Sequence, residues 1–320
     1  MKIRSELSFG RELDPDQITS YIARCAQLAM VLEVSASPKP GNIDRCHDFE
    51  DTRYEHFLAS ATGVYPVIEA AAEHRCGVGA LIRKAVHESV LWQKGGNTHF
   101  GAFLLLIPLS MAAGEVLGHV GATVNDLISR AHIIVKSTDT DDAIQFYRAF
   151  SCAGVNVTDV EEFDLQDRGA IDSLKEREVS LYDLMEISKG YDQIAREWTI
   201  GFTTCEYCGK LITQFMGQDS DLKGDPDINN AVVYAFLKLL AEHPDTFIQT
   251  KYDRDVAQKV SQQAKRVLDS IEKEGFDLDA ALPDIQHFDE ELIRDRINPG
   301  STADMIIAGL FIALLGGVRF

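Results

Sequence analysis

A glycine-rich run at residues 95–101, Gly-Gly-Asn-Thr-His-Phe-Gly, has the composition of a phosphate-binding turn. Its paired glycines permit a tight bend and a close approach of the backbone to a ligand. Asn97 and Thr98 are good caps for the apolar segment 102–113, and the N-terminus of such a helix offers N–H groups and a positive dipole to an anion. No Lys follows the glycines, so the run is not a Walker motif. These residues alone leave two interpretations open, a phosphate cradle or a capped helix start.

A second stretch, residues 37–51, combines a stiff proline loop with several carboxylates. Pro38 and Pro40 restrict the backbone on either side of Lys39 and so fix the direction of its ammonium group. The acidic residues at 44, 48, 50 and 51 supply hard oxygen ligands that suit Mg²⁺, whereas a single histidine, His47, argues against zinc. The other interpretation is that Asp51 or Thr52 caps the next helix and the remaining carboxylates are solvated.

Two further motifs have a functional and a structural interpretation each. Arg196 has the geometry to grip a phosphate with two hydrogen bonds, or to pair with the adjacent Glu197. Residues 298–304 (Asn-Pro-Gly-Ser-Thr-Ala-Asp) form another glycine turn before an apolar segment, and Asp304 has the spacing of a capping-box acid. The single C-x-x-C motif at 205–208 has no partner pair, so it predicts neither a zinc site nor a redox centre.

The elements that must position these residues are predicted to be helices, because apolar residues recur at helical spacing and alternating strand patterns are scarce. We expect an all-α, multi-helical single domain over 1–320. Its acidic segment at about 151–179 is predicted to be a loop or excursion between two helical halves, with a few short strands in 151–170 left open. The expected helices are one that starts at Asp14-Pro15 and ends before Ser37, and then 52–74, 77–92, 98–116, 122–136, 139–150, 180–216, 227–242, 253–274 and 300–315.

The strongly negative net charge indicates which classes of partner are unfavourable. Fifty acidic residues against 31 Lys and Arg give a formal charge of −19, a field that repels nucleic acid and anionic membranes. The six cysteines do not form a disulfide framework, the N-terminus lacks a signal-peptide pattern, and the apolar stretches are too short to span a bilayer. We therefore expect a cytoplasmic, soluble protein that binds neither nucleic acid nor membrane.

Taken together, these motifs resemble the ATP:dephospho-CoA triphosphoribosyltransferase family, also called triphosphoribosyl-dephospho-CoA synthases. The resemblance implies an all-α fold and a reaction in which the 2′-hydroxyl of 3′-dephospho-CoA replaces adenine on the triphosphoribose of ATP, giving a prosthetic-group precursor. The chain departs from the family pattern at 45–52, and 137–179 has no counterpart. The similar segments, in the family's order, are 33–44, 95–101, 195–197 with 201–202, 244–246 and 298–304.

The resemblance also implies roles for individual residues, with Mg²⁺ as the cofactor of ATP. Catalytic carboxyl groups are expected at Asp44, Asp48, Glu88 and Asp304. Metal ligands are expected at Asp44, Asp48 and Asp51. Nucleotide and phosphate binding is expected from Lys39, Lys94, Gly95, Gly96, Asn97, Thr98, His99, Arg196, Asn298, Gly300 and Ser301.

Two other functions stay open at the level of sequence. One is a related ATP-dependent glycosyltransferase or nucleotide hydrolase with a different acceptor, because the departures lie near the expected site. The other is a non-catalytic helical binding protein in which the glycine turns are merely caps, which predicts that Lys39, Asn97 and Asp304 point away from one another. A homodimer is compatible with all three.

Overall fold

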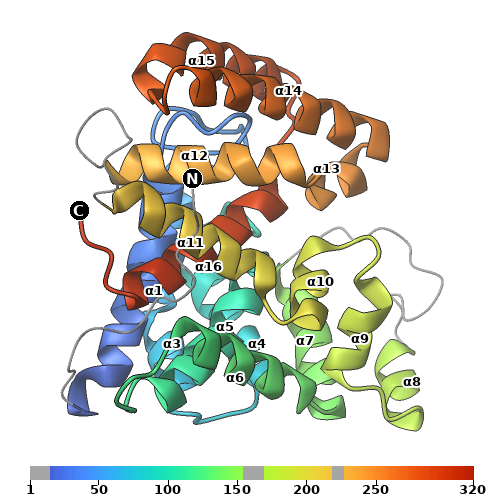
Figure 1. Ribbon diagram of the computed structural model, residues 1–320. Helices are drawn as coiled ribbons and strands as arrows, with labels where there is room; N and C mark the ends of the chain where they lie inside the picture. The colour runs from blue at the N-terminus through green and yellow to red at the C-terminus, as the bar shows by residue number, and fades with distance from the viewer. Residues whose placement is uncertain (1–14, 154–168, 218–226) are drawn as a thin grey trace.

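The computed structural model describes residues 15–153, 169–217 and 227–320, and within these ranges all regular structure is helical. The all-α prediction is confirmed (Figure 1). A 3₁₀ turn, Pro15–Gln17, precedes the first α-helix. The α-helices are α1 Ile18–Ser35, α2 Tyr54–Gly63, α3 Tyr65–Ala72, α4 Val78–Trp92, α5 Phe100–Val116, α6 Val124–Lys136, α7 Thr140–Ala153, α8 Ala170–Glu176, α9 Leu181–Ser188, α10 Gln193–Ile200, α11 Thr203–Met216, α12 Ile228–Glu242, α13 Thr246–Lys251, α14 Arg254–Lys273, α15 Leu278–Arg294 and α16 Gly300–Leu315.

Two long predicted helices are wrong as single elements. The predicted helix 52–74 divides into α2 and α3, because Pro66 lies in the first turn of α3 and has no N–H to continue the hydrogen bonds of α2. The predicted helix 180–216 divides into α9, α10 and α11. Asp192 accepts hydrogen bonds from Ile194 N and Ala195 N and so starts α10, and Gly201, at φ +74°, ends it.

Two further differences concern α8 and α15. Helix α8 lies inside the segment predicted as a loop, and residues 151–153 belong to α7, so the acidic excursion is shorter than predicted. Residues 154–168, which include most of the proposed short strands, lie outside the described residues. Helix α15 was not predicted, although Leu278, Ile285 and Leu292 recur on one face and are buried. Pro283 and the many acids of α15 hide that pattern in the sequence.

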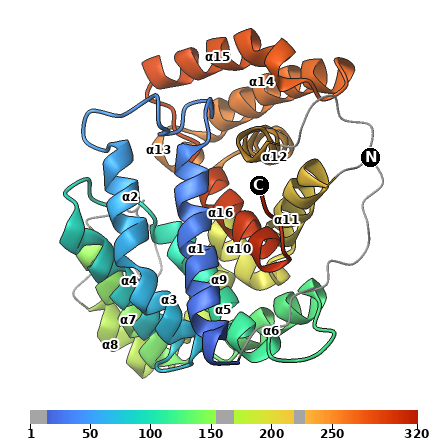
Figure 2. The same cartoon turned by 90° about the vertical axis from the view of Figure 1, so that its left-hand side faces the viewer.

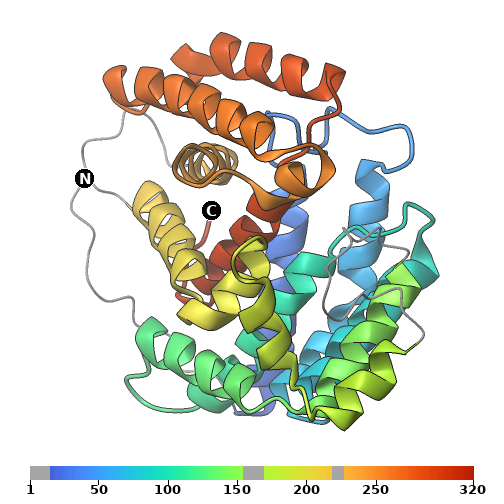
Figure 3. The same cartoon turned by 90° about the vertical axis from the view of Figure 1, so that its right-hand side faces the viewer.

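Helices α5 and α16 form the centre of the molecule. Both are apolar on every side and almost wholly buried, as expected of a helix enclosed by other helices. They pack against each other and against α1, while α11 packs along α16. Helices α12, α14 and α15 form a layer at the top of each view, and α7 to α9 lie below it on the other side of the core (Figures 1–3). The two glycine turns thus lead into the two central helices.

The cysteine pair at 205–208 belongs to this core rather than to a site. Cys205 and Cys208 are fully buried in α11, and burial raises the pKa of both thiols. Within the described residues, no helix is both long and apolar enough to cross a membrane.

Candidate active site

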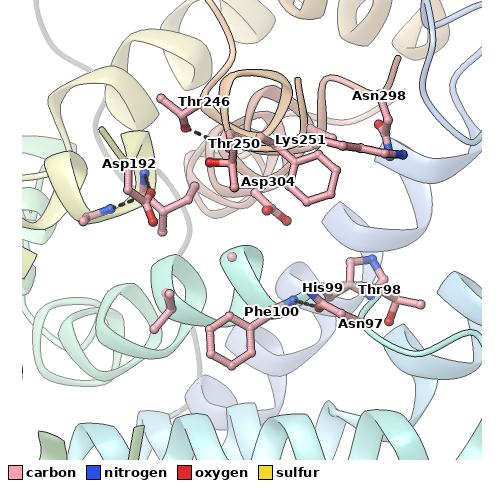
Figure 4. A pocket seen from close by; sticks show the side chains of 18 of the residues that line it. Asn97, Thr98, His99, Phe100, Asp192, Thr246, Thr250, Lys251, Asn298 and Asp304 are labelled. Atoms are coloured by element: carbon pink, nitrogen blue, oxygen red, sulfur yellow. Dashed lines mark hydrogen bonds between the residues drawn. The ribbon is translucent and has the colours of Figure 1, made fainter. Parts of the chain in front are cut away.

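A cavity of about 590 Å³ lies where α5 and α16 begin. Figure 4 shows Asn97 to Phe100 on one side of it and Asp192, Asp304 and Asn298 on the facing side. Side chains of α7, α9 and α13 complete the wall. The lining residues come from segments far apart in sequence: 33–57, 97–104, 146–150, 184–195, 246–251 and 296–307.

The carboxyl group of Asp304 lies against Gly101 at the centre of the cavity wall. A methyl group at position 101 would overlap Asp304 Oδ2, so glycine is required for the carboxyl group to take this place. The Asp304 side chain is partly buried and lines the cavity. Burial, and next the negative charge of Glu33, raise its pKa well above the usual range. A carboxyl group with a raised pKa holds a proton more readily than a solvated one, which suits proton exchange with a substrate.

Glu33 is a second carboxyl group at the cavity, and the buried Lys39 supports it. Lys39 Nζ forms an ion pair with Glu33 and donates to Asn42 Oδ1 at 2.8 Å. Asn42 Nδ2 then donates to Asn298 Oδ1 at 2.9 Å. Burial raises the pKa of Glu33, and the neighbouring Lys39 charge opposes that rise. Lys39 itself does not line the cavity, so it acts on the site through Glu33 and Asn42.

Asp192 is the third carboxyl group on the wall. Its Oδ1 caps α10, at 2.7 Å from Ile194 N and 3.2 Å from Ala195 N. Burial raises the pKa of Asp192 despite these two hydrogen bonds. Three carboxyl groups, from α1, from the start of α10 and from α16, therefore face one space, and their mutual repulsion favours protonation of at least one.

His99 lies in the wall as a neutral ring. Burial, and next the charge of Lys39, lower its pKa to about 3. Ser89 Oγ donates to Ser60 Oγ, which leaves the Ser60 hydroxyl hydrogen for His99 Nδ1 at 2.8 Å. That arrangement places the ring proton on Nε2, which has no hydrogen-bond partner within the described chain.

Half of the sequence-predicted site residues lie at the cavity. Three of them follow Gly95 and Gly96, four belong to the Asn298–Asp304 turn, and one is an acid of the 37–51 stretch. Two segments separated by about 200 residues thus meet, as the functional interpretation of the motifs requires. The residues are Asp51, Asn97, Thr98, His99, Asn298, Gly300, Ser301 and Asp304.

The other half does not line the cavity. Gly95 and Gly96 form the turn before it, held by Gln93, whose Oε1 accepts from Gly95 N and whose Nε2 donates to Gly96 O at 2.9 Å. Lys94 and Arg196 are exposed on the outer surface, and Glu88 lies along α4. The remaining residues of this group are Lys39, Asp44 and Asp48.

The predicted magnesium ligands do not converge. Asp44 is buried and accepts from Cys46 N at 2.7 Å and His47 N at 3.0 Å, which closes its own loop. Asp48 Oδ1 accepts from Tyr54 N at 2.7 Å and fixes the start of α2. Among the three predicted ligands, Asp51 alone lines the cavity. The three acids therefore do not fit a shared Mg²⁺ ion.

Among the lining residues that were not assigned from the sequence, four charged ones bear most directly on the chemistry. Glu33 begins the first family-like segment, and Asp192 occupies an N-cap position just before Ala195-Arg196-Glu197, so local signals for both were present. Lys251 ends α13 and Arg296 follows α15, and they bring positive charge to the rim of an otherwise acidic cavity. Nothing in the local sequence marks these two cations, because only the packing of α13 and α15 brings them to the cavity.

Comparison with known proteins identifies the family of this chain. The family model described as CitG: ATP:dephospho-CoA triphosphoribosyl transferase matches residues 19–319. A 2-(5''-triphosphoribosyl)-3'-dephosphocoenzyme-A synthase from Klebsiella pneumoniae is 24% identical over 317 residues, covering 95% of this chain and 92% of that protein. A crystal structure from Archaeoglobus fulgidus, assigned to a triphosphoribosyl-dephospho-coA synthase, has 27% identity and a TM-score of 0.63, covering 82% of this chain and all of that one. This chain therefore belongs to the ATP:dephospho-CoA triphosphoribosyl transferase family.

Proposed function

We propose that this protein transfers the triphosphoribosyl group of ATP to the 2′-hydroxyl of 3′-dephospho-CoA and releases adenine. Membership of the family supports the reaction. The observation that carries it in the structure is the convergence of three carboxyl groups, Glu33, Asp192 and Asp304, on one cavity that also receives the N-termini of two helices. Such a cavity combines groups for proton transfer with groups that bind phosphate.

The carboxyl groups suit the chemistry at the sugar. The C1′–N9 bond of ATP breaks, the C1′–O2′ bond to the acceptor forms, the hydroxyl proton goes to a cavity carboxylate, and the departing adenine takes up a proton. Negative charge beside C1′ stabilises the oxocarbenium-like transition state. Asp304 is the first candidate for the proton acceptor, because its carboxyl group lies against Gly101 in the cavity wall, beside the starts of both central helices.

The triphosphate must be held while the bond at the sugar is cut. The start of α16 at Gly300 and Ser301, and the side chains of Lys251 and Arg296, supply the dipole and positive charge for this. We propose that ATP enters as its magnesium complex, with Asp51 as the predicted ligand that lies close enough to take part. The remaining coordination positions then belong to phosphate and water, as Mg²⁺ commonly prefers.

The proposal is tested by incubating the protein with ATP, Mg²⁺ and 3′-dephospho-CoA and measuring adenine and the coupled product by mass spectrometry. Equal amounts of both are expected. Unchanged ATP with folded protein overturns the proposal. Adenine release that does not require 3′-dephospho-CoA favours a hydrolase or a transferase with another acceptor.

The role of the rim cations is tested with Lys251→Gln. Loss of one charged contact to phosphate is expected to raise KM for ATP roughly 10-fold with little change in kcat. Lys259→Gln, which removes an exposed charge from the neighbouring α14, is the matched control and should leave KM unchanged. An equal KM for the two variants would exclude Lys251 from the phosphate site.

A further inference from the structure

A compact group of potential metal ligands lies outside the cavity, where the loop after α1 meets α15. Asp44 and His47 belong to this loop, and Asp289 belongs to α15. One ligand atom from each residue lies within 4.8 Å of the others. Asp44 and Asp289 are buried, and none of the three lines the cavity described above.

The second observation is a buried carboxylate oxygen in this group that accepts no hydrogen bond within the described chain. Asp289 is 1% exposed, and its Oδ1 accepts from Gly41 N at 2.9 Å. Its Oδ2 has no hydrogen-bond partner among the described residues. Leaving such an atom unpaired in a protein interior is costly, so an additional partner is expected there.

The position of His47 indicates what that partner is. His47 Nδ1 lies 2.9 Å from Asp289 Oδ2 and 3.9 Å from Asp44 Oδ1. The short contact to Asp289 does not have hydrogen-bond geometry, and Nδ1 is itself without a hydrogen-bond partner in the described chain. Atoms that ligate one ion at about 2.1 Å lie roughly 3.0 Å apart in adjacent positions and at most about 4.2 Å apart, and the two distances from His47 Nδ1 agree with this range.

We propose that Asp44, His47 and Asp289 bind a divalent transition-metal ion that fastens the loop after α1 to α15. Two buried carboxylates this close repel each other, and a cation between them removes that repulsion. An imidazole nitrogen with two carboxylates suits Mn²⁺, Fe²⁺ or Co²⁺ better than Mg²⁺, which favours oxygen ligands. The His47 side chain is 37% exposed, which leaves room for water in the remaining positions.

The proposed ion affects the cavity only indirectly, through the loop that it holds. The same loop carries Asn42 and Ile43 into the cavity wall, so an ion at its base holds that part of the wall in place. The site does not contact substrate, and its ligands act as positioning residues. It is also separate from the Mg²⁺ proposed to arrive with ATP, so the two proposals fail independently.

Metal binding is therefore measured without substrates. The full chain is treated with chelator and titrated with Mn²⁺, Co²⁺, Zn²⁺ and, for comparison, Mg²⁺, with Mn²⁺ followed by electron paramagnetic resonance and Co²⁺ by its visible absorption. One equivalent of Mn²⁺ or Co²⁺ per chain is expected, with a higher melting temperature in the bound form. His47→Ala and Asp289→Asn are each expected to weaken binding at least 10-fold and to abolish the melting shift.

Two matched variants show whether a loss of metal binding is specific to the proposed ligands. Glu290→Gln removes an exposed acid beside Asp289 on α15, and Cys46→Ser removes the exposed thiol beside His47; both should bind like the wild type. Asp289→Asn keeps an oxygen for Gly41 N, and circular dichroism shows whether it folds; if it does not, His47→Ala decides alone. Absence of stoichiometric binding, binding untouched in the folded variants, loss in Cys46→Ser, or Mg²⁺ bound as tightly as Mn²⁺ would each overturn the proposal.

Discussion

At the scale of single residues, the contact between Gly101 and Asp304 joins the two glycine motifs into one site. Each motif has a structural interpretation by itself, because Asn97 and Ser301 are good residues for helix starts. In the structure, the Asp304 carboxyl group faces the cavity and does not turn back to cap its own helix, so the functional interpretation is favoured for this residue. It also corrects the expected direction of Lys39, which points into the wall.

The substitution Asp304→Asn is expected to lower kcat/KM for adenine release by roughly 10²- to 10³-fold, because an amide of the same shape cannot accept the proton of the incoming hydroxyl. Initial rates of adenine formation measure the effect. Asp284→Asn, at an exposed position on α15, is the control and should keep full activity. Wild-type rates in Asp304→Asn would remove this residue from the mechanism.

The substitution Gly101→Ala tests the same contact from the other side. The added methyl group overlaps Asp304 Oδ2, and the flexible carboxyl group can turn away, so the protein should fold while the carboxyl leaves its position. We expect a loss of at least about 10-fold in kcat/KM with an unchanged circular dichroism spectrum. Gly190→Ala, where an added methyl group meets nothing within 4 Å, should behave as the wild type. Equal activity of the two variants contradicts the argument.

At the scale of elements, Asp245 links α13 to α16 and so fixes the start of the helix that carries Asp304. Its Oδ1 caps α13 through Ile248 N at 3.1 Å, and its Oδ2 accepts from both the backbone N–H and the hydroxyl of Thr302 at 2.7 Å. Burial raises the pKa of Asp245 from 3.8 to about 6, although these hydrogen bonds oppose the rise. The junction is therefore sensitive to pH.

The direction in which stability changes with pH follows from the linkage between proton binding and folding. The folded state holds the Asp245 proton more tightly than the unfolded state, so its contribution to stability is complete below about pH 4 and is lost as the pH rises through about 6. In Asp245→Asn this dependence is absent. The stability advantage of the wild type over the variant should fall by about 2 kcal/mol between pH 4.5 and pH 7. Urea unfolding at both values measures it, and parallel pH profiles would show that Asp245 does not titrate in this range.

At the scale of the whole molecule, the cavity is lined by elements from most of the length of the described chain. Its walls come from α1, α5, α7, α9, α10, α13 and α16, which the core holds together. A ligand in the cavity therefore stabilises all of these elements at once. The strongly negative total charge makes the cations at the rim more important for a polyphosphate, because long-range attraction is lacking.

Thermal unfolding in the presence of Mg-ATP tests this cooperativity. At a ligand concentration about 100 times Kd, the free energy of unfolding should rise by about 2.7 kcal/mol, and the transition should move as a single step. Differential scanning calorimetry with and without nucleotide measures both quantities. Two separate transitions, with only one of them shifted, would show that the cavity belongs to a part of the molecule that unfolds on its own.

The sequence by itself determined the all-α class and most helix positions, and half of the site residues that it predicted line the cavity. Helical periodicity, proline and capping residues act through neighbours in the chain, so they can be recognised locally. This is why α4, α5, α12 and α16 were predicted within a few residues. The expectation that Asn97 and Asp304 share one site came instead from the resemblance to the family, and both line the cavity.

Only the tertiary structure decided which polar groups face the cavity. Lys39 and Asp51 lie in the same short stretch, yet one is enclosed by Glu33 and Asn42 and the other lines the cavity. Asp192 and Lys251 reach the site because α10 and α13 pack against α16, and Arg296 reaches it from the link between α15 and α16. Burial, pKa and the direction of a side chain depend on atoms that are distant in sequence, and no local pattern contains them.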